Sequence, residues 1–365
     1  MVGFYASWKG KAFLNKRELQ TMAGPLTMKK NLFPVFGLAF FFVSLFGRFC
    51  GAAELPLVRI AHGVFNEKVA ALWIGVEQDL FRRHGVEVQV VHIRSGPQTV
   101  AALASGDIQV AYTIAGSALS AAVGGMDVAL FAGIINRADG EFVVAPSIRK
   151  GEDLMGKRVG VQSIGGGVWL LTMLALEHFR LEPTRDKISL MVVGDHPVLT
   201  QALGTGRIDG AYLGYTFSTL LKEKGFHVLL DLAKAPILYQ GLGLAARRSY
   251  LRQNPQIVDA VLRGTLESVA FIQNPTYREV VLKSLAKNLR LTNIQEAENG
   301  YQALQWLYRL DIRPNLKGVQ NMQRLLSMTN PRVAGVKAED VVAEDPVQRT
   351  QKTSFYREIL AREKK

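Results

Sequence analysis

From residue 57 onward, short apolar runs alternate with segments whose apolar residues recur at helical spacing. Leu57–Ala61 and Val86–Ile93 are apolar and rich in β-branched residues, which is the pattern of strands. Between them Val69–Arg83 has helical periodicity, and a second helix opens at Pro97. Ile108–Tyr112 is again strand-like. The pattern therefore predicts a β-α-β-α-β unit.

This unit occurs a second time, 100 residues further along the chain. Residues 102–112 recur as residues 202–212 with six of eleven positions identical. Strands that alternate with helices indicate parallel sheets with crossover helices, so two copies predict two doubly wound α/β lobes. Ligands of such sheets bind beyond the carboxyl ends of the strands, which here face a crevice between the lobes. The second copy comprises predicted strands at 158–161, 188–193 and 208–212 and helices at 168–180 and 197–203.

The chain is predicted to cross between the lobes twice. Extended segments near 141–147 and 235–243 would form a hinge, and the chain after them is mostly helical. The predicted first lobe comprises residues 54–143 and 241–365, and the second comprises residues 144–240 with its hinge crossing.

Residues 28–53 have the layout of a secretory signal peptide. Met28-Lys29-Lys30 is a basic start, residues 32–47 are almost wholly apolar, and Gly51-Ala52-Ala53 offers a cleavage point. Residues 1–27 fit no signal pattern, so we interpret them as an upstream extension and expect translation to start at Met28. We expect export to the periplasm. The alternative is a retained anchor, for which this apolar run is short.

Composition excludes several classes of function. Residues 1–53 hold seven Lys or Arg and one Glu, so the remainder carries +7 of the total +13. That charge is dispersed, without basic blocks interleaved with aromatic residues, which argues against nucleic acid as a partner. Cys50 is the single cysteine, and no HExxH or similar ligand spacing predicts a metal. The segment 162–167 is neither a P-loop nor a dinucleotide fingerprint, and we expect no cofactor.

Five short motifs resemble one known family. Asp79–Val88, Ala104–Ala111, Asp153–Val161, Gly206–Ala211 and Thr353–Tyr356 are similar, in family order, to segments of periplasmic substrate-binding proteins of the nitrate/sulfonate/taurine type. The likeness covers about residues 55–360. It implies a type II periplasmic binding protein, with two α/β lobes joined by a two-crossing hinge, that feeds an ABC importer. Its relatives include proteins that bind thiamine-pyrimidine precursors.

We expect the ligand to contact the loops that follow the strands, where helix N-termini expose N–H groups. Arg94 and Arg137 would clamp a carboxylate or sulfonate, and Phe65 would stack on a ring. Gly165–Gly167 would form an anion nest. Capping turns, surface ion pairs and satisfied loop histidines are the alternatives. Glu67 and Asp139 could instead bind an amine. The candidate ligand-binding residues are His62, Phe65, Asn66, Arg94, Ser95, Thr113, Gly116, Ser117, Asn136, Arg137, Gln162, Ser163, Gly165, Gly166, Gly167, His196, Tyr212, Tyr215 and Thr216.

These features favour a ligand trap that captures a small polar or anionic organic molecule, such as a sulfonate, a carboxylate or a pyrimidine-like solute. A trap needs two lobes, a hinge and amide-lined loops, so we expect no catalytic residue. The expected partners are the small-molecule ligand and the permease and ATPase of an ABC importer, and we expect a monomer. Two alternatives stay open, namely an enzyme on the same fold acting on a pyrimidine or aromatic-acid metabolite, and a ligand sensor.

Overall fold

The protein was analysed as a computed structural model, which describes residues 54–94 and 96–363. The predicted upstream extension and signal peptide lie outside the described residues. Residues 54–365 form one compact unit, and everything below concerns the described part of it.

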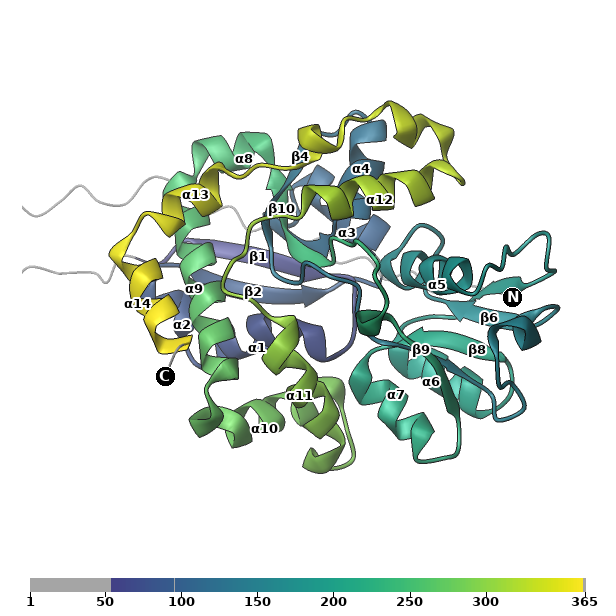
Figure 1. Ribbon diagram of the computed structural model, residues 1–365. Coiled ribbons are helices and arrows are strands. Elements are labelled where there is room, and N and C mark those ends of the chain that lie inside the picture. The colour runs from purple at the N-terminus through teal and green to yellow at the C-terminus, as the bar shows by residue number, and fades with distance from the viewer. Residues whose placement is uncertain (1–53, 95, 364–365) are drawn as a thin grey trace, which may run out of the picture. The chain divides into compact units, whose positions relative to one another are not determined.

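Ten strands form two five-stranded sheets, each of which defines a lobe (Figure 1). The first sheet has the order β2-β1-β3-β10-β4, and the second has the order β7-β6-β8-β5-β9. Lobe 1 holds β1 (Leu57–His62), β2 (Glu87–His92), β3 (Val110–Ile114), β4 (Val128–Gly133) and β10 (Leu242–Arg247). Lobe 2 holds β5 (Glu141–Val144), β6 (Arg158–Val161), β7 (Ser189–Val192), β8 (Gly210–Leu213) and β9 (His227–Asp231).

Helices follow the strands in both lobes, as the repeat predicts. The first copy contributes η1 (Glu67–Val69), α1 (Ala70–Glu77), α2 (Leu80–Arg83), α3 (Gly96–Ser105) and α4 (Ala115–Val123). The second copy contributes α5 (Gly167–His178), α6 (His196–Gly204) and α7 (Tyr215–Lys222). The C-terminal part is helical: α8 (Arg248–Gln253), α9 (Pro255–Gln273), α10 (Arg278–Leu289), α11 (Glu298–Leu307), α12 (Leu316–Ser327), α13 (Asp345–Gln351) and α14 (Ser354–Glu363). Of these, α9 packs on α1 and α2, whereas α11 reaches α7 and α12 reaches α5 in lobe 2.

Three expectations need correction. Each sheet is mixed rather than parallel, because β10 and β5 run antiparallel to both of their neighbours. Both β5 and β10 directly follow a crossing between the lobes. They therefore run in the direction opposite to that of the strands that follow helices. Because β5 pairs with β8 and β9, it belongs to the second sheet, and the lobes therefore divide before residue 141. The crossings lie at 134–140 and 232–241. The helix expected over residues 69–83 is interrupted at Asp79, which has φ 54°.

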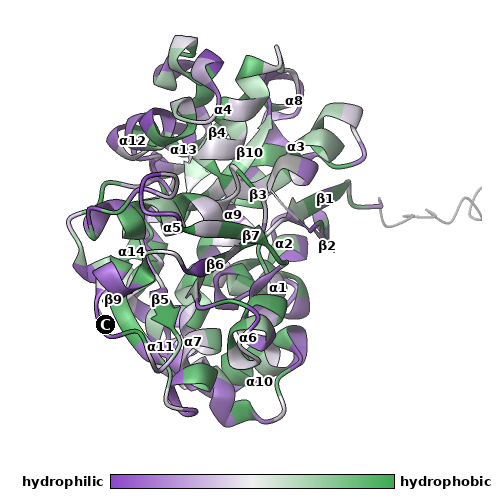
Figure 2. Cartoon of the chain, turned by 90° about the vertical axis from the view of Figure 1, so that its right-hand side faces the viewer, coloured by the Kyte–Doolittle hydropathy of each residue, from purple (hydrophilic) through white to green (hydrophobic). Residues whose placement is uncertain are grey.

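The core of each lobe surrounds the central strands. All residues of β3, β4, β5 and β8 are buried, because helices cover both faces of each sheet. Figure 2 shows the hydrophobic colour along β5, with hydrophilic colour on outer loops and helix faces. The packed sheets thereby hold the carboxyl ends of their parallel strands in fixed places at the boundary between the lobes.

Candidate functional site

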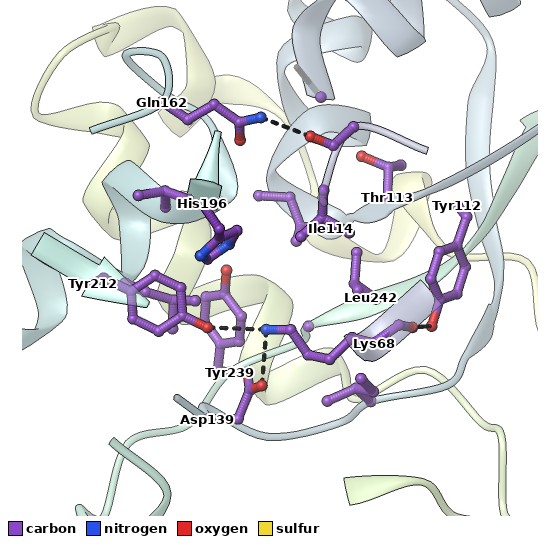
Figure 3. Close-up of a pocket in the computed structure, with 18 residues that line it drawn as sticks. Lys68, Tyr112, Thr113, Ile114, Asp139, Gln162, His196, Tyr212, Tyr239 and Leu242 are labelled. Carbon is purple, nitrogen blue, oxygen red and sulfur yellow. Dashed lines mark hydrogen bonds and ion pairs between the residues drawn. The ribbon is translucent and has the colours of Figure 1, made fainter. Parts of the chain in front are cut away.

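A cavity lies where loops from both lobes meet the two crossings (Figure 3). The space between its atoms measures about 540 Å³, open solvent included. It is lined by Gly63, Val64, Lys68, Gly96, Tyr112, Thr113, Ile114, Ile135, Asp139, Gln162, Gly167, Val168, Leu171, His196, Tyr212, Tyr239, Gly241 and Leu242. Most of these residues stand at or just beyond the carboxyl ends of parallel strands, where ligands of open α/β sheets bind.

A buried lysine forms the charged centre of the cavity. Lys68, in η1 of lobe 1, places its Nζ 2.8 Å from Oδ2 of Asp139 and donates a 2.9 Å hydrogen bond to the hydroxyl of Tyr212. The side chains of Lys68 and Asp139 are only 5% and 2% exposed. Removing either partner would leave the other charge buried and uncompensated, which is strongly unfavourable.

Two tyrosines of lobe 1 hold the backbone of this lysine. The hydroxyls of Tyr112 and Tyr308 both donate to the carbonyl oxygen of Lys68, at 2.9 and 2.8 Å. The Tyr308 hydroxyl in turn accepts a 3.1 Å hydrogen bond from the backbone N–H of Ala71. Burial raises the pKa of Tyr112 well above its ordinary value, so its phenol stays protonated and donates. These hydrogen bonds fix the backbone at the start of α1, from which the Lys68 side chain extends into the cavity.

The crossing before β5 passes close behind Tyr212. Gly140 has φ 81°, a conformation that other L-residues rarely adopt. A Cβ atom at this position would lie 2.5 Å from the Tyr212 ring and 2.7 Å from the carbonyl oxygen of Leu213. A glycine is therefore required for Asp139 to approach Lys68 and Tyr212 together.

Two further polar side chains face the same space. The Tyr239 hydroxyl is buried and has no hydrogen-bond partner among the described residues, and Figure 3 shows it pointing into the space below His196. Burial, followed by the charge of Lys68, lowers the pKa of His196 to about 3, so its imidazole is neutral. The His196 ring lies 3.2 Å from Nδ2 of Asn66 and 3.3 Å from the backbone nitrogen of Gly214.

The lobes touch each other around the cavity. Oε1 of Glu67 in lobe 1 accepts a 2.9 Å hydrogen bond from the backbone N–H of Tyr215, the first residue of α7 in lobe 2. Nε2 of Gln162 in lobe 2 donates to the carbonyl oxygens of Gly63 and Arg94, at 2.8 and 2.5 Å. These contacts describe a closed arrangement of the lobes.

The structure brings five of the predicted site residues together at the cavity, and others pack directly behind it. The five are Thr113, Gln162, Gly167, His196 and Tyr212. Asn66 contacts the ring of His196, and the Ser117 hydroxyl accepts a 3.0 Å hydrogen bond from Thr113. Gly116 lies against Leu170 and Leu326, and Gly166 is the N-cap of α5.

The remaining predicted residues lie away from the cavity lining. His62 and Phe65 line a second cavity beside β2, where His62 stacks on His92 with ring centroids 5.1 Å apart. Arg137 donates to the carbonyl oxygen of Ala233 and lies over the Trp306 ring. Ser95 lies outside the described residues. Arg94 has an exposed side chain, Asn136 donates to the carbonyl oxygen of Arg313, and the Tyr215 hydroxyl donates to Asp231. Gly165 lies near Leu326, Thr216 lies near Gly300, and the Ser163 hydroxyl is buried without a hydrogen-bond partner among the described residues.

Lys68 and Tyr239 are cavity residues that the sequence analysis did not select, whereas it names Asp139 as a group that could bind an amine. Lys68 directly precedes the apolar run Val69–Ile74, so its side chain starts from a buried turn. That position is the signal that distinguishes it from a solvated lysine. Asp139 and Tyr239 lie on the two crossings, where no helix or strand period indicates which way a side chain points.

Two searches of the described residues were negative. Among residues 54–94 and 96–363, no group of three or more His, Cys, Asp or Glu side chains is arranged to hold a metal ion. Within the same ranges, no helix combines the length and apolar character that a membrane crossing requires.

Comparison with known proteins identifies the family. Residues 66–276 match the family described as NMT1/THI5 like. The chain belongs to this family. Its curated relatives include the taurine-binding periplasmic protein of Escherichia coli K12, which is 28% identical over 226 residues, or 60% of this chain and 68% of the relative.

Solved structures related to this NMT1/THI5-like chain show the same fold. The alkanesulfonate-binding protein SsuA of Xanthomonas axonopodis pv. citri, bound to MOPS, superposes with a TM-score of 0.67 at 19% identity, covering 80% of this chain and 99% of SsuA. The periplasmic nitrate-binding protein NrtA of Synechocystis PCC 6803 gives 0.68 at 15% identity, covering 82% and 89%. The predicted fold, with two α/β lobes of the periplasmic binding protein type, is confirmed.

Proposed function

We propose that this chain is the solute-binding component of an ABC importer and captures a small organic molecule in the cavity between its lobes. The observation that carries the proposal is the cavity itself, which both lobes and both crossings line. Relatives named for binding taurine, alkanesulfonates and nitrate support the same role. The curated relative and NrtA are also named as periplasmic, so we propose that this chain works in the periplasm. We also propose that it works as a monomer.

Ligand capture follows from the two-crossing architecture. Rotation about the segments 134–140 and 232–241 would separate the loops of lobe 1 from those of lobe 2 and open the cavity. Contacts such as Glu67 to Tyr215 and Gln162 to Gly63 form only when the lobes meet. A ligand that touches both lobes binds the closed form better and shifts the population toward it. The closed form would then be the one that a permease and its ATPase recognise.

We propose that the ligand is released chemically unchanged. The charged groups that line the cavity, Lys68 and Asp139, are bound to each other rather than poised around an open reaction centre. We propose as ligand contacts five polar side chains that line the cavity, namely Thr113, Gln162, His196, Tyr212 and Tyr239.

A thermal-unfolding screen tests this function. A solute that binds only the folded form must raise the melting temperature, and at a hundred times its Kd it stabilises by about 2.7 kcal/mol. The screen includes sulfonates, carboxylates, pyrimidines and their uncharged analogues, and mass spectrometry of the bound solute shows whether it is altered. We expect at least one stabilising solute, recovered unchanged.

Two valine variants locate the binding. Val168→Phe would fill the cavity and abolish the shift, whereas Val198→Phe, on an exposed position of α6 in the same lobe, would leave it intact. No stabilising solute in the whole screen, or recovery of a converted product, would contradict the proposal.

A further inference from the structure

The lining of the cavity carries no net charge. Among the described residues that line it, Lys68 and Asp139 are the two with a formal charge, and their charged atoms are 2.8 Å apart. His196 adds no charge, because burial lowers its pKa to about 3. An incoming solute therefore meets a neutral surface with a buried ion pair in its floor.

The chain's own carboxyl groups already occupy two sites that would attract an anion. Asp139 is paired with the ammonium of Lys68. Glu67 is bonded to the backbone N–H at the start of α7, a position where the free N–H groups of a helix attract negative charge. Gly214, just before this helix, permits the approach, because a Cβ there would lie 2.8 Å from Oε1 of Glu67.

The arginines expected to clamp an anion are engaged elsewhere or exposed. The Arg137 guanidinium donates to the Ala233 carbonyl and lies over the Trp306 ring, and the Arg94 side chain is exposed. Neither residue lines the cavity. A solute with a full negative charge would thus gain a cation only by displacing Asp139, which would leave that carboxylate buried and unpaired.

The hydrogen-bond donors that the cavity presents to a solute are tyrosine hydroxyl groups. Tyr239 is 1% exposed, and its hydroxyl lacks a hydrogen-bond partner among the described residues. The Tyr212 hydroxyl accepts from Lys68, so its own proton is left for a second acceptor. Figure 3 shows both tyrosines at the edge of the same space. Ile114, Val168 and Leu171 also line the cavity and give it an apolar surface.

Building on the proposed function, we propose that the cavity binds an uncharged organic solute with an apolar body and an acceptor oxygen, such as a carboxamide, sulfonamide or ketone. The acceptor oxygen takes hydrogen bonds from Tyr239 and Tyr212, and the apolar body packs on the aliphatic side chains. The start of α5 at Gly167 also borders the cavity and favours an acceptor oxygen without requiring a full charge.

Matched probe pairs that differ in charge but hardly in shape test the proposal. The pairs are benzamide with benzoate and ethanesulfonamide with ethanesulfonate, and isothermal titration at pH 7.5 gives each Kd. For the unmodified protein we expect at least one uncharged member to bind tenfold or more tighter than its anionic partner. Tighter binding of the anion in either pair, or no binding of either uncharged probe, would overturn the proposal.

Two variants examine the chemical reason. Asp139→Asn leaves Lys68 without its anionic partner. In this variant the ratio of the two Kd values within the same probe pair should change by at least tenfold, so that the anion binds more tightly than the uncharged probe. Tyr239→Phe should weaken the uncharged probe about tenfold, whereas Tyr277→Phe, on an exposed ring outside the cavity, should not change it. The proposal would be contradicted if folded Asp139→Asn kept the preference for the uncharged probe, or if Tyr239→Phe bound that probe as tightly as the unmodified protein does. If a variant does not fold, the Kd values of the unmodified protein decide.

The experiment separates this proposal from the function on which it rests. If only anionic solutes bind and stabilise the protein, the solute-binding function stands and the preference for an uncharged ligand is wrong. If nothing in the wider thermal screen binds, the solute-binding function itself is wrong.

Discussion

Tyr112 and Tyr212 hold the same position in the two copies of the repeat, yet they bind opposite ends of one lysine. The Tyr112 hydroxyl donates to the backbone carbonyl of Lys68, at 2.9 Å and within lobe 1. The Tyr212 hydroxyl accepts from Nζ of Lys68, also at 2.9 Å, but from lobe 2. One tyrosine therefore supports the local fold, whereas its counterpart joins the lobes.

The difference shows how a repeated scaffold acquires a single asymmetric site. Both copies place a tyrosine within the equivalent strand, β3 or β8, because both sheets are built in the same order. Only the first copy supplies the lysine, so the charged centre belongs to lobe 1 while its partners, Tyr212 and Asp139, lie on lobe 2 and on a crossing. Closing the lobes completes the surroundings of Lys68.

Loss of the shared lysine should produce the largest effect. Lys68→Met removes the ammonium and leaves the Asp139 carboxylate buried without a cation, so we expect a loss of about 3–5 kcal/mol in the free energy of unfolding. Denaturant unfolding at pH 7.5 measures it. The double variant Lys68→Met/Asp139→Asn should recover much of the loss, because no uncompensated charge is left. A single variant that loses less than about 1 kcal/mol would show that the pair is solvated.

Acidification should destabilise both lobes through one buried histidine in each. Burial lowers the pKa of His62 to about 4 and that of His196 to about 3, whereas both titrate near 6.5 when unfolded. The unfolded chain then binds protons that the folded chain does not, so stability falls as the pH drops below 6.5. Each histidine accounts for about 2 kcal/mol at pH 5.

Single variants isolate the two contributions. His62→Asn and His196→Gln should each remove about half of the decline in unfolding free energy between pH 7 and pH 5. The comparison is needed because burial raises the pKa of Glu67, which acts in the opposite direction as the pH falls. A decline that is the same in both variants and in the unmodified protein would contradict the assignment.

The two equivalent tyrosines should differ when their hydroxyls are removed. Tyr212→Phe deletes a hydrogen bond to a charged group, worth about 1.5–3 kcal/mol, and it acts across the lobes. Tyr112→Phe should lose only about 1 kcal/mol, because Tyr308 still donates to the Lys68 carbonyl. Unfolding of both variants side by side measures the difference. Equal losses would mean that the repeat uses its tyrosines in the same way.

The repeat made much of the fold predictable. The parallel pairing among β1, β2 and β3, and among β6, β7 and β8, follows from alternating strands and helices. The directions of β5 and β10 did not follow, because a short apolar run fits a parallel and an antiparallel place equally well. The pairing also shifts by one residue, since Ile60 faces Val110 whereas Val159 faces Gly210, an offset of 99 rather than 100 in the first strand.

The site was predictable by loop but not by side chain. Thr113, Gln162 and Tyr212 were selected because they follow or end strands, and each lines the cavity. Arg94 and Arg137 were selected by the same rule, yet neither lines it, because a loop position does not determine where a long side chain points. Lys68 ends the loop that follows the first strand but is not among the predicted site residues, and its residue type does not indicate burial, because charged residues are usually solvated. The apolar run that follows Lys68 is the one sequence signal of its burial, and the packing of tyrosines and a glycine around it in the structure establishes that it is buried.

The ion pair at the rim of the lobe contact should matter least. Arg324 on α12 and Glu177 on α5 lie 2.7 Å apart, but both side chains are 50% exposed. Water and salt screen such a pair, so Arg324→Ala, Glu177→Ala and the double variant should give a coupling free energy below about 1 kcal/mol that fades in 0.5 M NaCl. Lys68 and Asp139 lie at nearly the same separation, but they are almost fully buried and Lys68 also donates to Tyr212. If the coupling free energy between Arg324 and Glu177 were as large as the effect of Lys68→Met, surface contacts rather than the buried lysine would stabilise the closed lobes. The contrast between Tyr112 and Tyr212 would then lose its functional meaning.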